Sequence, residues 1–180
     1  MGKSIYFVRH GQSEWNVLNK ICGKTDVPLT EKGFEQAKET ANIIIGSKIK
    51  IDEIRYSPLL RAKDTALEIS KIIGIPAYEE PRLKEQNFGK WEGVSPRSHE
   101  GFQAAKREFI NSYEGGESMF KMAQRIYNLL DDLNKDNKTY LLVAHNGIAR
   151  VVKSYFEDMS NEEYAAYGVK NCSITEFKYD

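Results

Sequence analysis

The sequence predicts a three-layer α/β domain, with a mostly parallel central sheet and helices on both of its faces. Short runs rich in apolar residues at 5–8, 54–57 and 139–144 have the composition of buried strands. Each is followed along the chain by a segment with apolar residues three and four apart, the spacing of an amphipathic helix. Strands that alternate with helices in this way form parallel sheets on which the helices pack back.

Two helices in the first half of the chain are predicted from their spacing and their end signals. The first runs from Thr30, as N-cap, to Gly46, as the stop. Its predicted inner face consists of Phe34, Ala37, Ala41, Ile44 and Ile45. The second opens with Ser57 as cap and Pro58 at the first helical position, and Gly74 ends it. Its predicted inner face consists of Leu59, Ala62, Ala66, Ile69 and Ile73.

The rest of the chain completes the same pattern. Residues 139–144 form a continuous run between polar flanks, typical of a central strand covered on both faces, and residues 173–177 alternate as an edge strand does. The other predicted elements are a strand at 76–79, a loop at 82–98, and helices over much of 100–112, at 119–133 and at 148–156. No repeat or linker divides the chain, so we expect residues 1–180 to form one domain.

Charge and composition exclude several classes of protein. Lys and Arg together number 26, as do Asp and Glu, so the formal net charge is zero, whereas a general nucleic-acid binder carries a basic excess. No apolar run approaches the ~20 residues of a membrane span. Cys22 and Cys172 lie outside any C-x-x-C pair, and two reduced thiols fit a cytosolic protein. We expect a cytoplasmic protein that binds neither nucleic acid nor membranes; the sequence does not indicate an oligomeric state.

Two of the three histidines follow predicted strands. His10 comes after residues 5–8 and His145 after 139–144, each with a glycine within two residues. Ligands of such folds bind beyond the carboxyl ends of the strands, where glycine lets backbone N–H groups approach an anion and a following helix N-terminus adds positive potential. Arg9 directly precedes His10, and Arg61 lies in the first turn of the helix after a third strand.

These residues predict a pocket for a small, highly charged anion, because guanidinium groups match the oxygens of phosphate. One histidine at a strand end is more often structural, but two at equivalent strand ends beside Arg9 favour a site. A metal site is the competing hypothesis. Arg9 would repel a cation, and neither His10 nor His145 has a flanking carboxylate at ligand spacing, so we expect no metal and no other cofactor.

Several motifs in the chain carry a resemblance to a known family. VRHGQSEWN, DVPLTEKG, SPLLRAKDTA, LKEQNFGKWEG, GGES and VAHNG occur in this order. They resemble the motifs of the histidine phosphatase superfamily, the phosphoglycerate mutase-like proteins. The resemblance implies that His10 is a phosphate-accepting nucleophile and that Glu85 is a proton donor. The phosphate-binding residues that it implies are Arg9, Arg61 and His145, with Asn16 lining the same pocket.

Two further positions bear on substrate binding. Cys22 and Gly23 resemble a Cys-Gly or Ser-Gly segment that touches substrate in the mutase branch of the family. Asn146 stands where the family often has glycine. Asn146 could cap the following helix, narrow the pocket or add a hydrogen bond.

A short segment, residues 94–115, is expected to form the cap over the pocket. The cofactor-dependent mutases that the chain resembles carry a much longer insertion here, with an Arg-Arg pair that grips the substrate. A mutase must also exclude water, or its phosphohistidine is hydrolysed, and a short cap leaves the pocket more open. We therefore predict a phosphatase of small phosphorylated metabolites. The alternatives are a mutase and a non-catalytic module that binds phosphorylated ligands.

Overall fold

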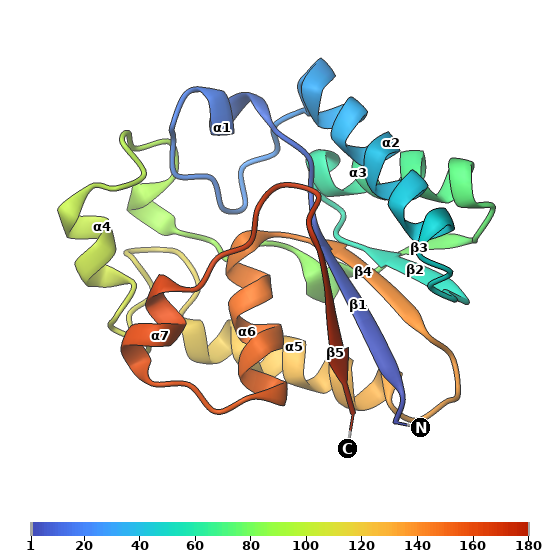
Figure 1. Ribbon diagram of the computed structural model, residues 1–180. Coiled ribbons are helices and arrows are strands. Elements are labelled where there is room, and N and C mark those ends of the chain that lie inside the picture. The colour runs from blue at the N-terminus through green and yellow to red at the C-terminus, as the bar shows by residue number, and fades with distance from the viewer. Residues whose placement is uncertain (1, 180) are drawn as a thin grey trace.

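A computed structural model describes residues 2–179 and shows a five-stranded sheet with helices on both faces (Figure 1). The strands are β1 (Ser4–Arg9), β2 (Glu53–Tyr56), β3 (Ala77–Glu79), β4 (Tyr140–Ala144) and β5 (Ile174–Lys178). Their order in the sheet is β3-β2-β4-β1-β5, with β5 antiparallel to β1 and the other pairs parallel. The predicted α/β fold is confirmed, including the central place of β4 and the edge place of β5.

Four longer helices cover the two faces of the sheet. Figure 1 shows α2 and α3 over one face, and α5 and α6 over the other. The α-helices are α1 (Glu14–Val17), α2 (Glu31–Gly46), α3 (Leu60–Ile73), α4 (Glu100–Ala105), α5 (Met119–Leu133), α6 (Asn146–Phe156) and α7 (Asn161–Ala166). Two short 3₁₀ helices, η1 (Pro81–Leu83) and η2 (Gly89–Trp91), lie in the predicted loop. Within residues 2–179, no helix is long and apolar enough to cross a membrane.

The central strand β4 shows how the two faces are filled. All five of its residues are buried. Tyr140, Leu142 and Ala144 belong to the apolar cluster that contains α5 and α6, whereas Leu141 and Val143 belong to the cluster under α2 and α3. This alternation follows from the two-residue period of a strand and makes β4 the shared wall of both cores.

The predicted first helix is correct in its start and partly wrong in its inner face. Thr30 caps α2, since its hydroxyl accepts a hydrogen bond from the Gly33 N–H at 3.1 Å. Phe34 and Ile45 are 36% and 56% exposed. The buried stripe consists instead of Gly33, Ala37, Thr40, Ala41 and Ile44. These smaller side chains allow α2 to approach its neighbours closely, which bulky Phe34 would prevent.

The second helix begins later than the Ser57-Pro58 pair predicts. Leu59 is the N-cap of α3 and makes no side-chain capping bond, while Ser57 lies outside the helix. The Ser57 hydroxyl is instead within 2.7 Å of the His145 Nε2 atom, so this side chain serves the site and not the helix end. Gly74 ends α3 with a φ of 72°, as predicted, and Ile73 is only half-buried.

The short helices of the structure differ from those that the sequence predicts. The helix expected over much of 100–112 is limited to the six residues of α4, and α1 and α7 were not predicted at all. Both α1 and α7 are short and are held by capping boxes, with Ser13 and Ser160 at their N-caps. Helices this short lack the repeated apolar spacing on which the predictions depend.

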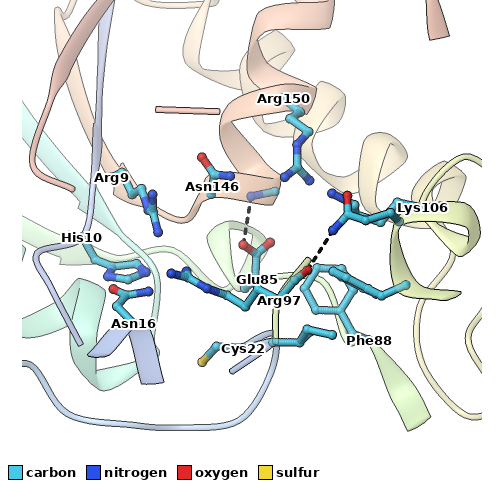
Figure 2. Close-up of a pocket in the computed structure, with 14 residues that line it drawn as sticks. Arg9, His10, Asn16, Cys22, Glu85, Phe88, Arg97, Lys106, Asn146 and Arg150 are labelled. Carbon is cyan, nitrogen blue, oxygen red and sulfur yellow. Dashed lines mark hydrogen bonds between the residues drawn. The ribbon is translucent and has the colours of Figure 1, made fainter. Parts of the chain in front are cut away.

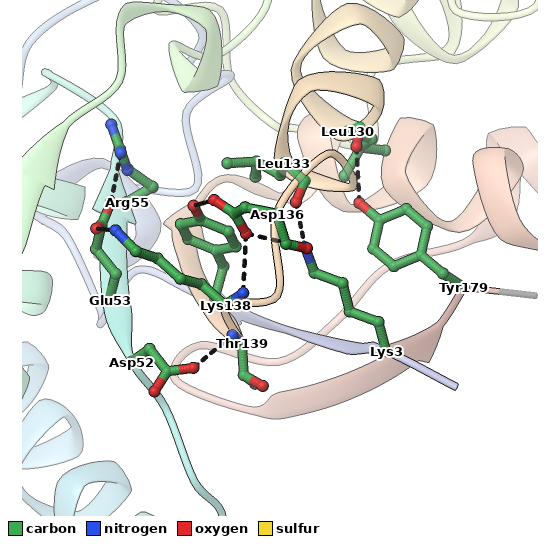
Figure 3. Close-up of polar contacts among 11 residues, drawn as sticks. Lys3, Asp52, Glu53, Arg55, Leu130, Leu133, Asp136, Lys138, Thr139 and Tyr179 are labelled. Carbon is green, nitrogen blue, oxygen red and sulfur yellow. Dashed lines mark hydrogen bonds and ion pairs between the residues drawn. The ribbon is translucent and has the colours of Figure 1, made fainter. Parts of the chain in front are cut away.

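Polar contacts tie together the amino ends of β1, β2 and β4 (Figure 3). These ends lie at the opposite edge of the sheet from His10 and His145, which follow the carboxyl ends of β1 and β4. The Lys3 ammonium donates to the Asp136 carbonyl at 2.8 Å, and the Tyr140 hydroxyl donates to the Asp136 carboxylate at 2.6 Å. Lys138 pairs with the buried Glu53 carboxylate at 2.8 Å. These contacts join β1, β2 and β4 at their amino ends. They do not involve the carboxyl ends of these strands, where His10 and His145 lie.

Truncation of Leu130 tests the packing of α5 on the sheet. Leu130 is fully buried, so Leu130→Ala should lower the free energy of unfolding by about 2–5 kcal/mol, through lost apolar contact and a residual cavity. The matched control is Leu67→Ala on α3, where the side chain is 42% exposed and the change should stay within about 0.5 kcal/mol. Urea denaturation measures both. Equal effects of the two substitutions would contradict the packing.

Candidate active site

A cavity of about 260 Å³ lies beyond the carboxyl ends of β1 and β4. Six of the residues predicted for the site line it, namely Arg9, His10, Asn16, Cys22, Glu85 and Asn146. They come from distant parts of the chain, and Figure 2 shows their side chains gathered around one space. The strands bring them together because parallel strands place all of their carboxyl ends at one edge of the sheet.

His10 follows β1 directly and is only 4% exposed. Its Nδ1 atom lies 2.7 Å from the Gly11 carbonyl oxygen. A carbonyl only accepts hydrogen bonds, so Nδ1 carries the proton and Nε2 of the neutral ring holds a free lone pair. Burial, Arg61 and Arg9 hold the pKa of His10 well below its usual range, which keeps the ring neutral near pH 7.

His145 is fully buried beside His10, with the two ring centroids 5.2 Å apart. Its Nε2 atom is 2.7 Å from the Ser57 hydroxyl oxygen, and its Nδ1 atom has no hydrogen-bond partner among residues 2–179. Burial, Arg61 and His10 hold the pKa of His145 well below its usual range. His145 is therefore a neutral ring held against His10, at the end of β4.

Arg9 is the last residue of β1. Its guanidinium donates to the Val169 carbonyl at 2.7 Å, and its buried Nε–H has no partner among the described residues. Burial and the nearby charge of Arg97 lower the pKa of Arg9 to about 10, so Arg9 stays positively charged at neutral pH.

Arg61 is almost completely buried, at 1% exposure, and does not line the cavity directly. Its guanidinium donates to the carbonyl oxygens of Gly23 and Thr25 at 2.7 and 2.8 Å, which fixes the loop that carries Cys22. Its Nε–H lacks a partner within the described part of the chain. The structure therefore shows Arg61 as a buried positive charge behind His10 that also holds one wall of the cavity.

Glu85 lies in the segment between η1 and η2 and is 5% exposed. One carboxylate oxygen accepts the Gln86 N–H at 2.8 Å, and the other accepts the Gly147 N–H at 2.9 Å. Burial raises the pKa of Glu85, although both hydrogen bonds oppose the shift. A carboxyl group with a raised pKa is suited to hold and release a proton near neutral pH.

Glycine is required at position 147 by the closeness of Glu85. A Cβ atom at this position would lie 2.4 Å from the Glu85 Oε1 atom. The N–H groups of Gly147 and Gly11 both have partners within the protein. The Gly147 N–H is used by Glu85, and the Gly11 N–H donates to the Thr65 hydroxyl at 3.0 Å.

Asn16 is held in place by its own turn and by a residue near the C-terminus. Its Oδ1 atom accepts the Ser13 N–H at 3.0 Å and lies 3.3 Å from the Asn171 amide nitrogen. Asn171 also donates to the His10 carbonyl at 2.8 Å. Asn171 could not be predicted as part of the site, because it belongs to none of the motifs.

Cys22, Gly23 and Asn146 each have a definite place. Burial raises the pKa of the Cys22 thiol to about 11, so it is a neutral thiol in the cavity wall. The Gly23 N–H donates to Glu92 at 3.1 Å, while its carbonyl binds Arg61. Asn146 does not cap α6, because it is the first helical residue and its Oδ1 atom accepts the Val169 N–H at 2.9 Å. Of its three possible roles, capping is excluded, and its side chain lines the cavity.

Two aromatic side chains contribute a further part of the wall, Phe88 from the LKEQNFGKWEG motif and Phe102 from residues 94–115. Phe88 and Phe102 line the cavity with their rings in edge-to-face contact, and they form a small apolar cluster with Ile21 and Tyr113. The cavity residues that sequence reasoning missed are Arg97, Gln103, Lys106 and Arg150. Of these, only Arg150 could have been predicted, because it lies four residues after Asn146 on the same helix and therefore on the same face.

No group of three or more His, Cys, Asp or Glu side chains able to hold a metal ion occurs within residues 2–179. His99 is exposed, and its ring caps α4 by accepting the Gly101 N–H.

Titration of the histidine rings tests the electrostatics of the site. Since the pKa values of His10 and His145 are lowered, both rings should remain neutral at about pH 6, where an ordinary imidazole with a pKa of about 6.5 is mostly protonated. Ring nitrogen and carbon chemical shifts in NMR report the charge, with a histidine-containing model peptide as reference. A His10→Gln variant assigns the signals. Protonation of His10 at the same pH as the peptide would contradict a buried, arginine-flanked ring.

Comparison with known proteins connects this site with a family. Residues 5–180 match the model of the histidine phosphatase superfamily (branch 1). The chain is 35% identical over 144 residues to the uncharacterized phosphatase PhoE of Bacillus subtilis (strain 168), covering 79% of this chain and 71% of that protein. It is 29% identical over 197 residues to the 2,3-bisphosphoglycerate-dependent phosphoglycerate mutase of Enterococcus faecalis, covering 88% of this chain and 86% of the mutase.

A solved structure agrees with these sequence matches. Phosphoserine phosphatase from Entamoeba histolytica, in complex with 3-phosphoglyceric acid, superposes with a TM-score of 0.81 at 30% identity, covering 97% of this chain and 89% of that chain. The family match covers nearly the whole chain, and the fold is shared. The chain belongs to the histidine phosphatase superfamily.

Proposed function

We propose that the protein is a metal-independent phosphomonoesterase that hydrolyses small phosphorylated metabolites through a phosphohistidine on His10. The observation that carries the proposal is the state of the His10 ring. Its Nδ1 proton is committed to the Gly11 carbonyl, its pKa is held low, and Glu85 lines the same cavity of about 260 Å³. A nucleophile and a proton donor thus share one small space beside arginine charges.

The buried polar groups around His10 suit the binding of a phosphate group. The Nε–H groups of Arg9 and Arg61 have no protein partner among residues 2–179, nor has the Nδ1 atom of His145. Buried donors without partners cost free energy, and phosphate oxygens accept such bonds. In this proposal Arg9, Arg61 and His145 bind the phosphate, and Asn16 lines the pocket beside it. Cys22, Gly23 and Asn146 complete the wall that faces the rest of the substrate.

The reaction has two steps. The lone pair on Nε2 of His10 attacks phosphorus while the bond from phosphorus to the ester oxygen breaks, and protonated Glu85 gives its proton to the departing oxygen. Glu85, now a carboxylate, then takes a proton from a water molecule that attacks the phosphohistidine. Inorganic phosphate leaves, and the neutral ring and protonated Glu85 are restored. The arginine charges stabilise the transferring phosphoryl group in both steps.

Residues 94–115 act in this proposal as a short cap within a single domain formed by residues 1–180. Their position supports this role, since four residues of this segment line the cavity, namely Arg97, Phe102, Gln103 and Lys106. Such a cap leaves a route for the water that the second step needs. We also infer a cytoplasmic location, which the free thiols of Cys22 and Cys172 support.

Phosphoryl transfer of the mutase type is the second candidate, supported by the Enterococcus faecalis relative. Incubation with 3-phosphoglycerate separates the two, because a phosphatase releases inorganic phosphate and a mutase yields the isomeric phosphoglycerate. Binding of phosphate without turnover of any ester would instead point to a non-catalytic module.

Replacement of His10 tests the nucleophile. His10→Ala should abolish release of phosphate from p-nitrophenyl phosphate, because His10 is the one histidine among the described residues that line the cavity. Rapid quenching of the unsubstituted protein with radioactive substrate should give an acid-labile, base-stable protein adduct that His10→Ala lacks. Both assays contain EDTA, and loss of activity that a divalent ion restores would contradict the metal-independent mechanism. Normal turnover by the His10→Ala protein would contradict the assignment of His10 as the nucleophile.

Replacement of Glu85 tests the proton donor through the leaving group. Glu85→Gln should slow hydrolysis of an alkyl phosphate by about 10²–10⁴-fold, because an alkoxide must be protonated as it leaves. Hydrolysis of p-nitrophenyl phosphate should be slowed much less at the first step, since nitrophenolate leaves without a proton. Glu79→Gln, at an exposed position on β3, is the matched control. A uniform loss on both substrates would indicate a structural role for Glu85.

A further inference from the structure

The cavity wall is strongly basic on the side of residues 94–115. Arg97, Lys106 and Arg150 line it, and Glu85 is the one carboxylate among the described residues that do. The chain as a whole carries equal numbers of acidic and basic side chains, so this concentration of positive charge is local. None of the three forms an ion pair with a carboxylate within residues 2–179.

The three cations divide into two groups. Figure 2 shows the Arg97 side chain reaching across the cavity toward His10 and Asn16, whereas Arg150 and Lys106 lie together on the opposite side of Glu85 from His10. The charge of Arg97 also contributes to the lowered pKa values of Arg9 and His10, as expected for a neighbour of both. Arg97 therefore belongs with the phosphate end of the cavity, and Arg150 and Lys106 do not.

The fold places Arg150 and Lys106 near each other on one side of the cavity. Arg150 projects from α6, and its Nε–H donates to the Tyr167 carbonyl at 2.8 Å, which leaves its two terminal nitrogens for other partners. Lys106 follows α4, and its ammonium lies 5.4 Å from the centre of the Phe102 ring. Burial and the charges of Arg150 and Arg107 lower the pKa of Lys106 to about 8, so that it remains mostly protonated at pH 7.

The number of charges exceeds what one phosphate requires. A phosphate monoester carries about −1.5 to −2 at pH 7, and Arg9, Arg61 and Arg97 already lie near His10. Lys106 and Arg150 repel each other at the other end of the same cavity. This repulsion raises the free energy of the protein when no anion is bound. A second anionic group on the substrate would be attracted by both.

We propose that Lys106 and Arg150 form a second anion subsite, so that the preferred substrates are small phosphate monoesters with a second anionic group, a carboxylate or another phosphate, on the same short skeleton. This inference rests on the proposed phosphatase function for the identity of the first group. The cavity volume of about 260 Å³ is sufficient for a short skeleton that carries two such groups.

Three compounds with one carbon skeleton test the subsite. Glycerol 3-phosphate, 3-phosphoglycerate and glycerol 1,3-bisphosphate carry at the far carbon a hydroxyl, a carboxylate and a phosphate, respectively. Calorimetric titration of the His10→Ala protein measures binding without turnover, and kcat/KM of the unsubstituted protein measures hydrolysis. We expect the preferred one of the two ligands with a second anionic group to bind about 10–100-fold more tightly than glycerol 3-phosphate. Tighter binding of 3-phosphoglycerate would identify the second anionic group as a carboxylate, and tighter binding of glycerol 1,3-bisphosphate would identify it as a phosphate.

Variants of the two cations show whether they cause the preference. Lys106→Gln and Arg150→Gln, each combined with His10→Ala, should reduce the affinity ratio between the preferred ligand and glycerol 3-phosphate by about tenfold. Lys106→Arg and Arg150→Lys retain the charge and should keep most of the ratio, which separates charge from folding. Lys71→Gln, exposed on α3, is the matched control and should leave the ratio unchanged.

The outcomes distinguish the subsite from the phosphatase proposal. Equal binding of all three compounds, or a preference that survives a Lys106→Gln, Arg150→Gln double variant, would overturn the subsite even if every compound is hydrolysed. A charge-dependent preference in binding together with no hydrolysis of any ester would retain the subsite and overturn the phosphatase.

Discussion

The hydrogen bond from His10 Nδ1 to the Gly11 carbonyl, 2.7 Å long, is the interaction on which the chemistry of the site depends. It fixes the tautomer of the ring, and it does so with a backbone atom whose position is set by the end of β1. The surrounding burial and arginine charges keep the second nitrogen free of a proton. A histidine on the surface would have neither property, since water would solvate both nitrogens and both charge states.

The rest of the fold holds other groups around that ring. The ends of β1 and β4 place His10 and His145 side by side, and Asn171, close to β5, binds the backbone of His10. Arg61 joins α3 to the loop of Gly23 and Thr25, so that one buried charge both acts on His10 and shapes a wall. The polar contacts at the amino ends of the strands lie far from this edge, and they stabilise the sheet without adding charge to the cavity.

The sheet, its central strand and the gathering of Arg9, His10, Glu85 and Asn146 could be predicted, because strand ends and motif order carry that information. The predicted helix caps were wrong where the expected capping side chain binds another partner. Ser57 resembles a helix cap in sequence but binds His145, and Asn146 accepts from Val169 instead of capping α6. The places of Lys106 and Arg97 in the cavity wall could not be predicted, because they depend on how residues 94–115 fold back, which leaves no periodic signal.

Helix α6 connects the acid to the far end of the cavity. Its first turn contains Gly147, whose N–H holds the Glu85 carboxyl, and Arg150 follows three residues later on the same rigid element. The rise between them along the helix axis is about 4.5 Å. In the proposed function, the backbone positions that hold the acid and carry Arg150 therefore keep a constant separation, because both belong to one helix.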